Sequence, residues 1–524
     1  MGINFETLSD IIRHHGAERP DASAMRFEGQ RFTYGQWDRE SNQLAQALLA
    51  EGIGPADRVG FLAHNTPEYF PLLFGAAKIR AVTLAVNWRL APAEMEYILD
   101  HADVGVLVIG PEFVGHLAAM NLPRLRKVVV ITDDAAVAGT ADLETFAAWR
   151  QTYPATDPGT RSSLDDVCYQ LYTSGTTGLP KGVEVSNRAL VQQMVNRCKV
   201  WQFDADTVNL VCLPLFHIAG SGWAVAGLWC GADAVLLREI DPVEMLAVIP
   251  AEGVTNAIMV PAVIQMLLAT PGAADADFSS FRNIVYGAAP ITEDVLIRAM
   301  ETFRCDFVAG YGLTEHATAT YLPSEDHDPG GPRAHLLRSV GKAVDDVEIK
   351  IVDTDTMVEL ADGEVGEVWL RGPQVMTGYA KRPDDTAAAM PGDGWLRTGD
   401  AGYLESGYLY LKDRVKDMII SGGENVYPAE VENALMPHPD IVDVAVIGVP
   451  DPKWGETVKA IVVPRSGAAP DEGAIIEFCR ERLAHFKCPT SVDFIEVLPR
   501  NPSGKVLKTE LREPYWVGID RRIN

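Results

Sequence analysis

The sequence predicts an α/β protein. We expect a large N-terminal domain of two mostly parallel βαβ sheets with a small antiparallel β subdomain, followed by a smaller α+β C-terminal domain. Up to about residue 340, short apolar runs alternate with amphipathic helical segments in two stretches, a rhythm typical of parallel sheets covered by helices. Beyond that point the runs are separated by turn signals such as Asp362-Gly363, which indicate antiparallel strands.

The first stretch opens with an apolar run at 58–63, which we expect to form a strand. Thr66 has the character of a helix N-cap and Pro67 that of a first helical residue, because Thr accepts from free helix N–H groups and Pro lacks an N–H. The apolar residues that follow have the spacing of a helix with one buried face: Phe70, Leu73, Phe74 and Ala77. Residues 105–109 and 127–131 are further strand candidates.

The second stretch and the C-terminal part supply the remaining predicted elements. In the second stretch the strands are 208–213, 234–237, 256–260 and 283–286. In the C-terminal part they are 347–352, 365–370, 408–411, 442–449, 458–463 and 492–495, with an amphipathic helix marked by Ile475, Phe478, Cys479 and Leu483. We place the domain boundary near Lys416, which gives domains of 1–415 and 416–524.

The charge balance indicates a strongly acidic surface. The chain has 524 residues, with 45 Lys and Arg against 72 Asp and Glu and a formal charge of −27. Such a surface repels nucleic-acid phosphates and anionic lipid heads, so we expect no nucleic-acid partner and no membrane-surface role. Any anionic ligand must be met by locally placed Lys, Arg and backbone N–H groups.

The cysteines and apolar runs favour a cytoplasmic protein that is not an integral membrane protein. The seven cysteines are odd in number and have no CxxC spacing, which favours buried thiols over disulfides or a zinc site. The N-terminus has neither the basic start nor the apolar core of a signal peptide. Residues 213–232 lack Lys, Arg, Asp and Glu, but their Pro, His and Gly favour a buried segment over a membrane span. A homodimer is left open.

The strongest chemical signal is the segment Tyr172–Gly182, which follows an apolar run. Its glycines let backbone N–H groups approach an anion, its hydroxyls add donors and its lysine adds charge, a combination that suits a triphosphate. The residues concerned are Thr173, Ser174, Gly175, Thr176, Thr177, Gly178 and Lys181. The spacing is not that of the GxxxxGK[ST] P-loop, which disfavours a Walker-type NTPase. A flexible polar turn is the alternative without a function.

This segment resembles the phosphate-binding motif of the adenylate-forming superfamily of acyl-CoA synthetases, amino-acid adenylation domains and luciferases. Further motifs of that family occur here in its order, over about Tyr34 to Leu511. They are Gly287-Ala288-Ala289-Pro290, Gly310-Tyr311-Gly312-Leu313-Thr314-Glu315, Thr398-Gly399-Asp400, Asp413-Arg414-Val415-Lys416-Asp417 and Asn501-Pro502-Ser503-Gly504-Lys505. The chain is therefore expected to use ATP, Mg²⁺ and, as acceptor, coenzyme A.

The resemblance implies a role for each motif of the large domain. Glu315 would bind Mg²⁺, a hard cation that prefers carboxylate, water and phosphate oxygens, and Thr314 would contact the α-phosphate. Residues 287–290 would form the adenine wall, and residues 310–313 would lie beside the nucleotide. Asp400 would accept from the ribose hydroxyls, and Arg414 would donate to the ribose or a phosphate.

In the C-terminal domain the resemblance implies a moving catalytic lysine. Lys505 would bridge the substrate carboxylate and the ATP phosphate, because an ammonium offsets the repulsion between two anions. Lys416 would be the hinge about which a mobile domain turns between an adenylating and a thioester-forming pose. Gly422 and Gly423 would approach the pantetheine arm, and Lys487 would meet a coenzyme A phosphate. Exposed lysines and a plain turn are the alternatives.

The segment 213–220 resembles the family's acyl-pocket segment, with His217 near the carboxylate or the pantetheine channel. The other pocket candidates are apolar or small: Ile218, Ala219, Gly220, Trp223, Val225, Tyr286 and Ala288. Glycines at 220 and 222 are expected to leave room for a longer tail. No acid lies between Leu210 and Ala232, which disfavours an amino-acid substrate because its ammonium would lack a partner.

We therefore expect an AMP-forming acyl-CoA synthetase for a hydrophobic acid, most simply a medium- or long-chain fatty acid. Other acids stay open, namely a coumarate- or benzoate-like aryl acid and a steroid side-chain acid. An acyl-AMP ligase that loads a carrier protein and a non-catalytic binding protein are the other readings. A luciferase lacks support, since the chain ends without Ser-Lys-Leu. Four residues depart from the common family pattern: Arg80, Glu184, Asn187 and Ala309.

Overall fold

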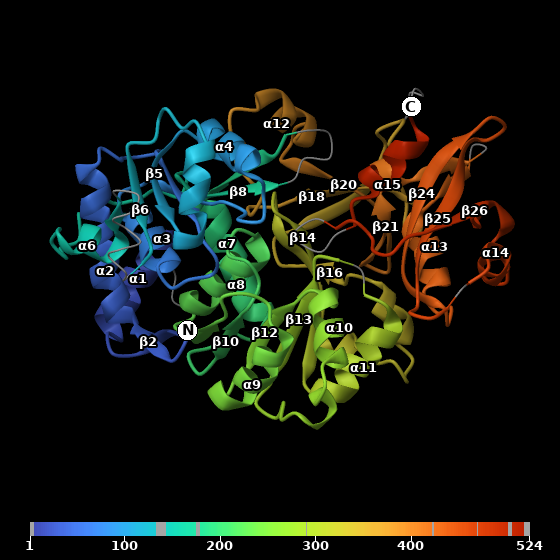
Figure 1. Cartoon of the computed structure of the whole chain (residues 1–524), viewed down its shortest axis with the longest axis horizontal. Coiled ribbons are helices and arrows are strands. Elements are labelled where there is room, and N and C mark those ends of the chain that lie inside the picture. Colours follow the sequence, from blue (N-terminus) through green and yellow to red (C-terminus); the bar gives the residue numbers. More distant parts are fainter. Residues whose placement is uncertain are drawn as a thin grey trace. The chain divides into compact units, whose positions relative to one another are not determined.

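The computed structural model contains two large sheets in the N-terminal part of the chain (Figure 1). The structure describes residues 5–132, 143–173, 179–289, 291–421, 424–468, 470–500 and 506–517, without the side chains of Asp413, Lys416 and Asn425. One sheet has eight strands in the order β19-β9-β8-β4-β3-β5-β6-β7. These are β3 (Arg58–Leu62), β4 (Val82–Ala85), β5 (Val104–Ile109), β6 (Lys127–Val130), β7 (Glu144–Thr145), β8 (Val167–Thr173), β9 (Lys181–Ser186) and β19 (Gly378–Tyr379). Its pairs are parallel except at the β8–β9–β19 edge.

The other sheet has nine strands in the order β16-β15-β14-β13-β12-β10-β11-β1-β2. They are β1 (Ser23–Phe27), β2 (Gln30–Thr33), β10 (Val208–Val211), β11 (Asp233–Leu236), β12 (Asn256–Met259), β13 (Asn283–Gly287), β14 (Asp306–Leu313), β15 (Ala317–Leu322) and β16 (Lys342–Ala343). Along the sheet, neighbouring strands from β14 through β13, β12, β10 and β11 to β1 pair in parallel. The antiparallel strands β15 and β16 close one edge, and the antiparallel strand β2 closes the other. Two mostly parallel sheets are thus confirmed, and the predicted runs in them became strands β3, β5, β6, β10, β11, β12 and β13.

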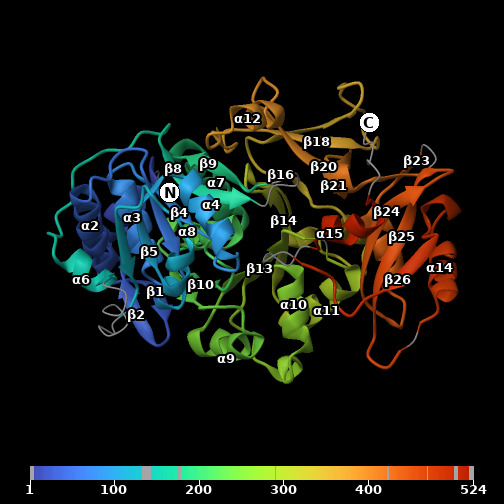
Figure 2. The same cartoon turned by 45° about the horizontal axis from the view of Figure 1, so that its top comes forward.

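Helices connect the parallel strands, and Figures 1 and 2 show α9, α10 and α11 gathered beside β13. The helices of this part are α1 (Leu8–Glu18), α2 (Tyr34–Ala50), α3 (Tyr69–Lys78), α4 (Pro92–His101), α6 (Phe146–Gln151), α7 (Asn187–Val200), α8 (Ile218–Trp229), α9 (Pro242–Glu252), α10 (Pro261–Ala269), α11 (Glu293–Phe303) and α12 (Pro383–Ala389). The 3₁₀ segments are η1 (Pro111–Ala119), η2 (Ala273–Asp275), η3 (Ser324–Asp326) and η4 (Ala334–Arg338).

Helix α3 differs from its prediction in two ways. It begins at Tyr69 after an N-cap at Glu68, so the assignment of Thr66 as N-cap and Pro67 as first helical residue was wrong. The Thr66 and Pro67 carbonyls accept from the N–H groups of Tyr69 and Phe70, and the turn so formed delays the helix. Every residue of α3 is buried, because core residues surround the helix and none of its faces is open to solvent.

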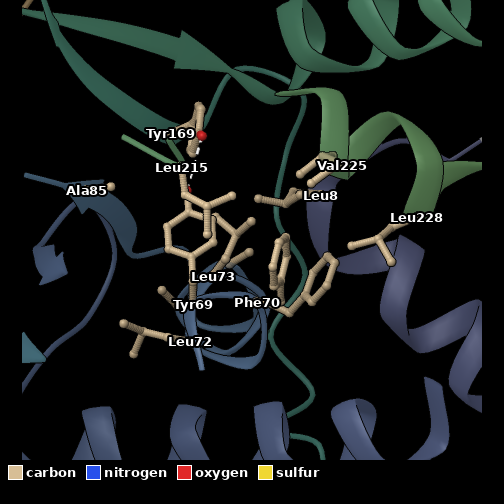
Figure 3. Packing of buried hydrophobic residues seen from close by; sticks show 14 of the residues in the cluster. Leu8, Tyr69, Phe70, Leu72, Leu73, Ala85, Tyr169, Leu215, Val225 and Leu228 are labelled. Atoms are coloured by element: carbon tan, nitrogen blue, oxygen red, sulfur yellow. Dashed lines mark hydrogen bonds between the residues drawn. The ribbon is translucent and has the colours of Figure 1, made fainter. Parts of the chain in front are cut away.

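The interior around α3 is the largest hydrophobic cluster of the chain's described part, and it contains residues of both large sheets. Figure 3 shows Phe70 and Leu73 of α3 near Val225 and Leu228 of α8. The Tyr69 hydroxyl donates to the Tyr169 hydroxyl at 3.1 Å within this apolar surrounding. Helix α8 is almost wholly buried, which confirms the prediction for the apolar run 213–232. No helix in the described ranges is long and apolar enough to cross a membrane.

The C-terminal part contains two smaller sheets. The four-stranded sheet has the order β17-β18-β20-β21, with β17 (Glu348–Val352), β18 (Gly366–Arg371), β20 (Trp395–Glu405) and β21 (Tyr408–Arg414). The five-stranded sheet contains β22 (Ile419–Ser421), β23 (Glu424–Val426), β24 (Ile441–Asp451), β25 (Gly455–Pro464) and β26 (Ser491–Phe494). The pairs β20–β21, β22–β23, β22–β25 and β24–β25 are antiparallel, and β26 joins β25 in parallel.

Helices cover both faces of the five-stranded sheet. They are α13 (Pro428–Leu435), α14 (Glu472–Arg480) and α15 (Lys508–Arg512), with 3₁₀ segments η5 (Val415–Asp417), η6 (His485–Lys487) and η7 (Glu513–Tyr515). Alternate residues of β24 enter two separate clusters: Val444 and Val446 pack with residues of α13 and α14, and Ala445 and Ile447 with Leu511 of α15. The period of two follows from the pleat of a strand.

By their contacts, the residues form two compact units. The first comprises Met1–Glu348 and Leu370–Leu396, and the second Ile349–Trp369 and Arg397–Asn524. The second unit therefore includes much of the four-stranded sheet as well as the C-terminal α+β part. The expected division into 1–415 and 416–524 concerns a motion, which a single conformation does not reveal, and it stays a prediction.

Candidate active site

The phosphate-loop prediction falls on the hairpin between β8 and β9. Thr173, the last residue of β8, is directly opposite Lys181, the first residue of β9. Ser174, Gly175, Thr176, Thr177 and Gly178 lie outside the described residues. The register nevertheless brings Thr173 and Lys181, which flank the predicted loop, together on adjacent strands of the eight-stranded sheet.

Lys181 has two partners in this structure. Its ammonium forms an ion pair with Asp385 of α12 and lies 5.0 Å from the ring centroid of Tyr379. The hydrogen bond from Lys181 lowers the pKa of the Asp385 carboxyl, and Arg382 nearby adds to this effect. The lysine side chain is 21% exposed, so its ammonium stays accessible to a ligand that can displace Asp385.

Thr314 and Glu315 lie in the turn between β14 and β15. This turn is tight, since a methyl group at Gly312 would overlap the Ala317 carbonyl and Ala317 itself has φ of 59°. Glu315 is half-buried, and its Oε1 accepts from the Tyr379 hydroxyl at 2.8 Å. A charge-assisted hydrogen bond of this kind orients a carboxylate while leaving its second oxygen for a ligand.

Tyr379 brings the two motifs together. It belongs to β19, which pairs with β9, and it contacts Lys181 through its ring and Glu315 through its hydroxyl. A cation and a carboxylate from two different sheets therefore converge on one side chain. The sequence analysis missed Tyr379 and Asp385, and no spacing or local pattern around residues 378–385 distinguishes them.

The predicted adenine-wall segment begins where β13 ends. Gly287 pairs with Gly310 of β14, and a methyl group at Gly287 would overlap the Gly310 carbonyl oxygen. Ala288 and Ala289 are exposed, and Ala288 has φ of 65°, so the backbone turns sharply after the strand. Pro290 lies outside the described residues. Tyr286 is buried, and its hydroxyl contacts Nε2 of His327 at 2.9 Å.

His217 is the N-cap residue of α8. Burial, with a smaller effect of Arg89, lowers the pKa of its imidazole to about 4, so the ring is neutral at pH 7. Its Nε2 is enclosed and has no hydrogen-bond partner among the described residues, and its ring lies 4.5 Å from that of Phe216. A buried polar atom without a partner is uncommon in folded proteins and is a candidate for ligand contact.

The space beside the α8 glycines is filled by protein. A methyl group at Gly220 would overlap the Pro214 carbonyl oxygen, and one at Gly222 would overlap the Arg197 guanidinium. The expectation that these glycines leave room for an acyl tail was therefore wrong, because they allow close packing instead. Trp223 is 1% exposed and donates from its indole N–H to the Leu210 carbonyl at 3.0 Å, as a core residue does. Ile218 and Ala219 are half-buried.

Asp400 and Arg414 form a pair within the second unit. They are opposite each other in the β20–β21 ladder, and Arg414 Nε lies 2.8 Å from Asp400 Oδ1. Arg414 also donates to the Thr398 carbonyl at 3.2 Å. Asp400 is only 7% exposed, so the pair presents an oriented carboxylate and a guanidinium that are suited to hydroxyl and phosphate groups.

Of the remaining predicted residues of the C-terminal part, the structure describes Lys487 and the backbone of Lys416. Lys487 in η6 pairs with Glu430 of α13 at 2.7 Å. Lys416 lies in η5, and its side chain is not described. Gly422, Gly423 and Lys505 lie outside the described residues, so their roles stay predictions.

The phosphate-loop sequence between β8 and β9, with Lys181 and a Glu315 carboxylate that Tyr379 orients, is typical of adenylate-forming enzymes as a class. The chain belongs to the AMP-binding enzyme family, which it matches over residues 12–380, and residues 430–505 match the AMP-binding enzyme C-terminal domain. It is accordingly an AMP-forming ligase of carboxylic acids, and the resemblance drawn from the motifs is confirmed.

Relatives with assigned activities cover almost the whole chain. The fatty acid–[acyl-carrier-protein] ligase ScoC of Streptomyces coeruleorubidus is 39% identical, over 99% of this chain and 98% of its own. Feruloyl-CoA synthase of an Amycolatopsis species is 37% identical, over 95% and 96%. Among solved structures, ATP-bound MatB from Rhodopseudomonas palustris has a TM-score of 0.88 at 28% identity, and covers 97% of this chain and 99% of its own.

Proposed function

We propose that the protein converts a hydrophobic carboxylic acid, most simply a medium- or long-chain fatty acid, into its acyl-adenylate and transfers the acyl group to coenzyme A. The observation that carries this proposal is the convergence of Lys181 and Glu315 on Tyr379. It joins the end of the phosphate hairpin to the carboxylate motif, which is the pairing that ATP activation needs. The long-chain-fatty-acid–CoA ligase FadD13 of Mycobacterium tuberculosis, 35% identical, supports the choice of acid.

In the first half-reaction a carboxylate oxygen attacks the α-phosphorus of ATP, and the bond to the bridging oxygen of pyrophosphate breaks. Lys181 would neutralise phosphate charge beside the 174–178 loop, and Thr314 would donate to the α-phosphate. Lys505 would hold the two anions together. Donors fixed where charge develops are worth more than mobile ones, because they need no reorganisation during the step.

Glu315 fits a Mg²⁺ ion, since one of its oxygens is oriented by Tyr379 and Mg²⁺ typically takes one or two carboxylates together with substrate phosphates. The ion would neutralise charge on the nucleotide. No cluster of three or more His, Cys, Asp or Glu that could hold a metal occurs in the described part of the chain. The nucleotide phosphates and water would supply the other ligands.

In the second half-reaction a thiolate attacks the acyl carbon and AMP leaves. We assign Asp400 and Arg414 to the ribose and phosphate, Lys416 to the hinge, and Gly422, Gly423 and Lys487 to coenzyme A. His217 would lie beside the reacting carbonyl. Its neutral ring at pH 7 can contact the acyl-adenylate without adding a buried charge.

A carrier protein is the second candidate for the acceptor. The 39% identity to ScoC, a ligase that acts on an acyl carrier protein, favours it. Aryl and steroid side-chain acids also stay candidates, because feruloyl-CoA synthase and the 3-[(3aS,4S,7aS)-7a-methyl-1,5-dioxo-octahydro-1H-inden-4-yl]propanoyl:CoA ligase of Rhodococcus jostii are 37% and 34% identical.

The experiment is AMP release from ATP with fatty, aryl and steroid acids, each assayed with coenzyme A, with a phosphopantetheinylated carrier protein and with no acceptor. We expect the fastest multiple turnover with a fatty acid and coenzyme A. Turnover with the carrier protein alone would transfer the assignment to the second candidate. Absence of acid-dependent AMP release with every acid would refute the proposed activity.

A further inference from the structure

Arg197 is a buried arginine of α7 that has no acidic partner among the residues that the structure describes. It is 4% exposed, and its Nε and Nη1 are enclosed and have no hydrogen-bond partner among the described residues. Burial lowers the pKa of its guanidinium to about 10, so the group is still charged at neutral pH. Arg512, the other arginine that is buried in the described part, pairs with Asp417 at 2.7 Å.

The surroundings of Arg197 compensate its charge only in part. Its guanidinium carbon lies 5.1 Å from the ring centroid of Trp201, a cation–π contact that is weaker than an ion pair with a buried carboxylate. The groups that influence its charge most are the Tyr169 phenol and the Cys198 thiol, both of them neutral at pH 7. A buried cation without a counter-charge is costly, and an anion or hydrogen-bond acceptor bound beside the guanidinium would offset this cost.

The guanidinium lies against the first turns of α8. A methyl group built on Gly222 would overlap Arg197 Nη1 and would lie 3.2 Å from Ile218 Cδ1. The missing side chain at 222 is therefore what lets the arginine reach α8, one turn after His217. Burial raises the pKa of the Tyr169 phenol to about 12, and the Ser221 hydroxyl and the Arg197 charge oppose this effect. Figure 3 shows Tyr169 above Tyr69 at this point of the core.

We propose that Arg197 binds an oxygen group at the end of the acid remote from the carboxyl that is activated. This inference rests on the proposed function, in which His217 lies beside the reacting carbonyl, so that the tail of the acid would continue from there along α8 towards Arg197. The substrate class is then a hydrophobic acid whose far end carries a second carboxylate, a hydroxyl or a carbonyl. All three accept hydrogen bonds from a guanidinium, and a carboxylate also supplies the missing counter-charge.

The test compares acids that differ only at the far end: decanoic, 10-hydroxydecanoic, 9-oxodecanoic and decanedioic acid, and cinnamic against 4-hydroxycinnamic acid. For each set the ratio of kcat/KM, substituted over unsubstituted, is measured by coenzyme A-dependent AMP release. For at least one substituted acid the wild-type enzyme should give a ratio on the order of ten- to a hundredfold, the usual range for hydrogen bonds to a charged group. Comparison of decanedioic acid with the hydroxy and oxo acids shows whether Arg197 requires a negative charge or only a hydrogen-bond acceptor.

Arg197→Met should reduce that ratio at least tenfold, and Arg197→Lys should keep part of it. The control is Arg188→Met on the exposed side of the same helix, where Arg188 pairs with Asp165, and its ratio should stay at the wild-type value. Gly222→Ala provides a second route, because its methyl group would displace the guanidinium, and it should also lower the ratio.

Two outcomes overturn the inference: a wild-type preference for the unsubstituted acid in every set, or an unchanged ratio in folded Arg197→Met. If Arg197→Met does not fold, the wild-type ratios and Gly222→Ala decide. Turnover of unsubstituted acids with no preference would refute this inference alone, whereas the lack of acid-dependent AMP release with any acid refutes the proposed activity itself.

Discussion

Replacing Asp385 with Asn should tighten ATP binding, because Lys181 would lose the carboxylate with which it is now paired. In this conformation Asp385 competes with any phosphate that approaches the ammonium. The substitution keeps the shape of the side chain and removes its charge. It also removes the carboxylate 3.5 Å from Arg382, whose Nη2 keeps its hydrogen bond to the Tyr97 hydroxyl at 3.0 Å.

The size of the effect follows from the exposure of the pair. The side chains of Lys181 and Asp385 are 21% and 30% exposed, and ion pairs of such exposure contribute about 0.2–1 kcal/mol. If the ion pair between Lys181 and Asp385 must break when ATP binds, its absence in Asp385→Asn lowers the dissociation constant of ATP about 1.4- to 5-fold. The gain should shrink at high salt, since screening weakens the competing pair.

The assay is calorimetric titration of ATP at low and high ionic strength. Asp384→Asn is the matched control, because Asp384 lies next to Asp385 in α12 and is exposed. Both variants lose one negative charge at the same helix end, so the difference between them isolates the contact with Lys181. Equal affinity in the two variants, or weaker binding in Asp385→Asn, would refute the competition.

Further predictions concern acid stability, strand packing and domain motion. Lowering the pH from 7.5 to 5 should destabilise the first unit by about 2 kcal/mol through His316. Burial lowers the pKa of His316 to about 3 in the folded chain, whereas a histidine of the unfolded chain has a pKa of about 6.5. Over this pH range only the unfolded chain therefore binds the proton, which favours unfolding. In urea unfolding, the loss of stability between pH 7.5 and 5 should be smaller in His316→Gln than in the wild type and unchanged in the exposed control His335→Gln. Equal losses in the two variants would contradict the prediction. Gly287→Ala should lower the melting temperature and abolish adenylation, since its methyl group would collide with the Gly310 carbonyl; full activity would show that β13 and β14 can separate. Lys416→Pro should spare acyl-adenylate formation and impair thioester formation, as measured by the separate half-reactions, and unchanged overall turnover would argue against a hinge there.

Many of the strands could be predicted because their signals are local, whereas their order within each sheet was not predicted. Apolar runs such as 105–109 and 256–260 became strands within one or two residues, and the contrast between the parallel and antiparallel parts followed from the spacing of runs and turns. Helix α3 shows the limit of this reasoning. Its amphipathic spacing suggested one buried face, but tertiary packing buries the whole helix.

The sequence motifs predicted which residues belong to the site, but they did not predict which side chains contact one another. Glu315 and Lys181 were identified from their own segments, and their convergence on Tyr379 depends on β19 pairing with β9 across about 200 residues of chain. Nothing local in a two-residue strand indicates that partner. Arg197 was missed for a related reason, since an arginine in an amphipathic helix is ordinarily a surface residue and only the packing against Gly222 reveals its burial.

The central claim is that one protein performs two chemical steps through the same acyl-adenylate, the first of them dependent on Lys505. The most direct measurement separates the steps in Lys505→Ala. Acid-dependent exchange of labelled pyrophosphate into ATP should be lost, while thioester formation from synthetic acyl-adenylate and coenzyme A should continue near the wild-type rate. Exchange at the wild-type rate, or an equal loss of both half-reactions, would contradict the account.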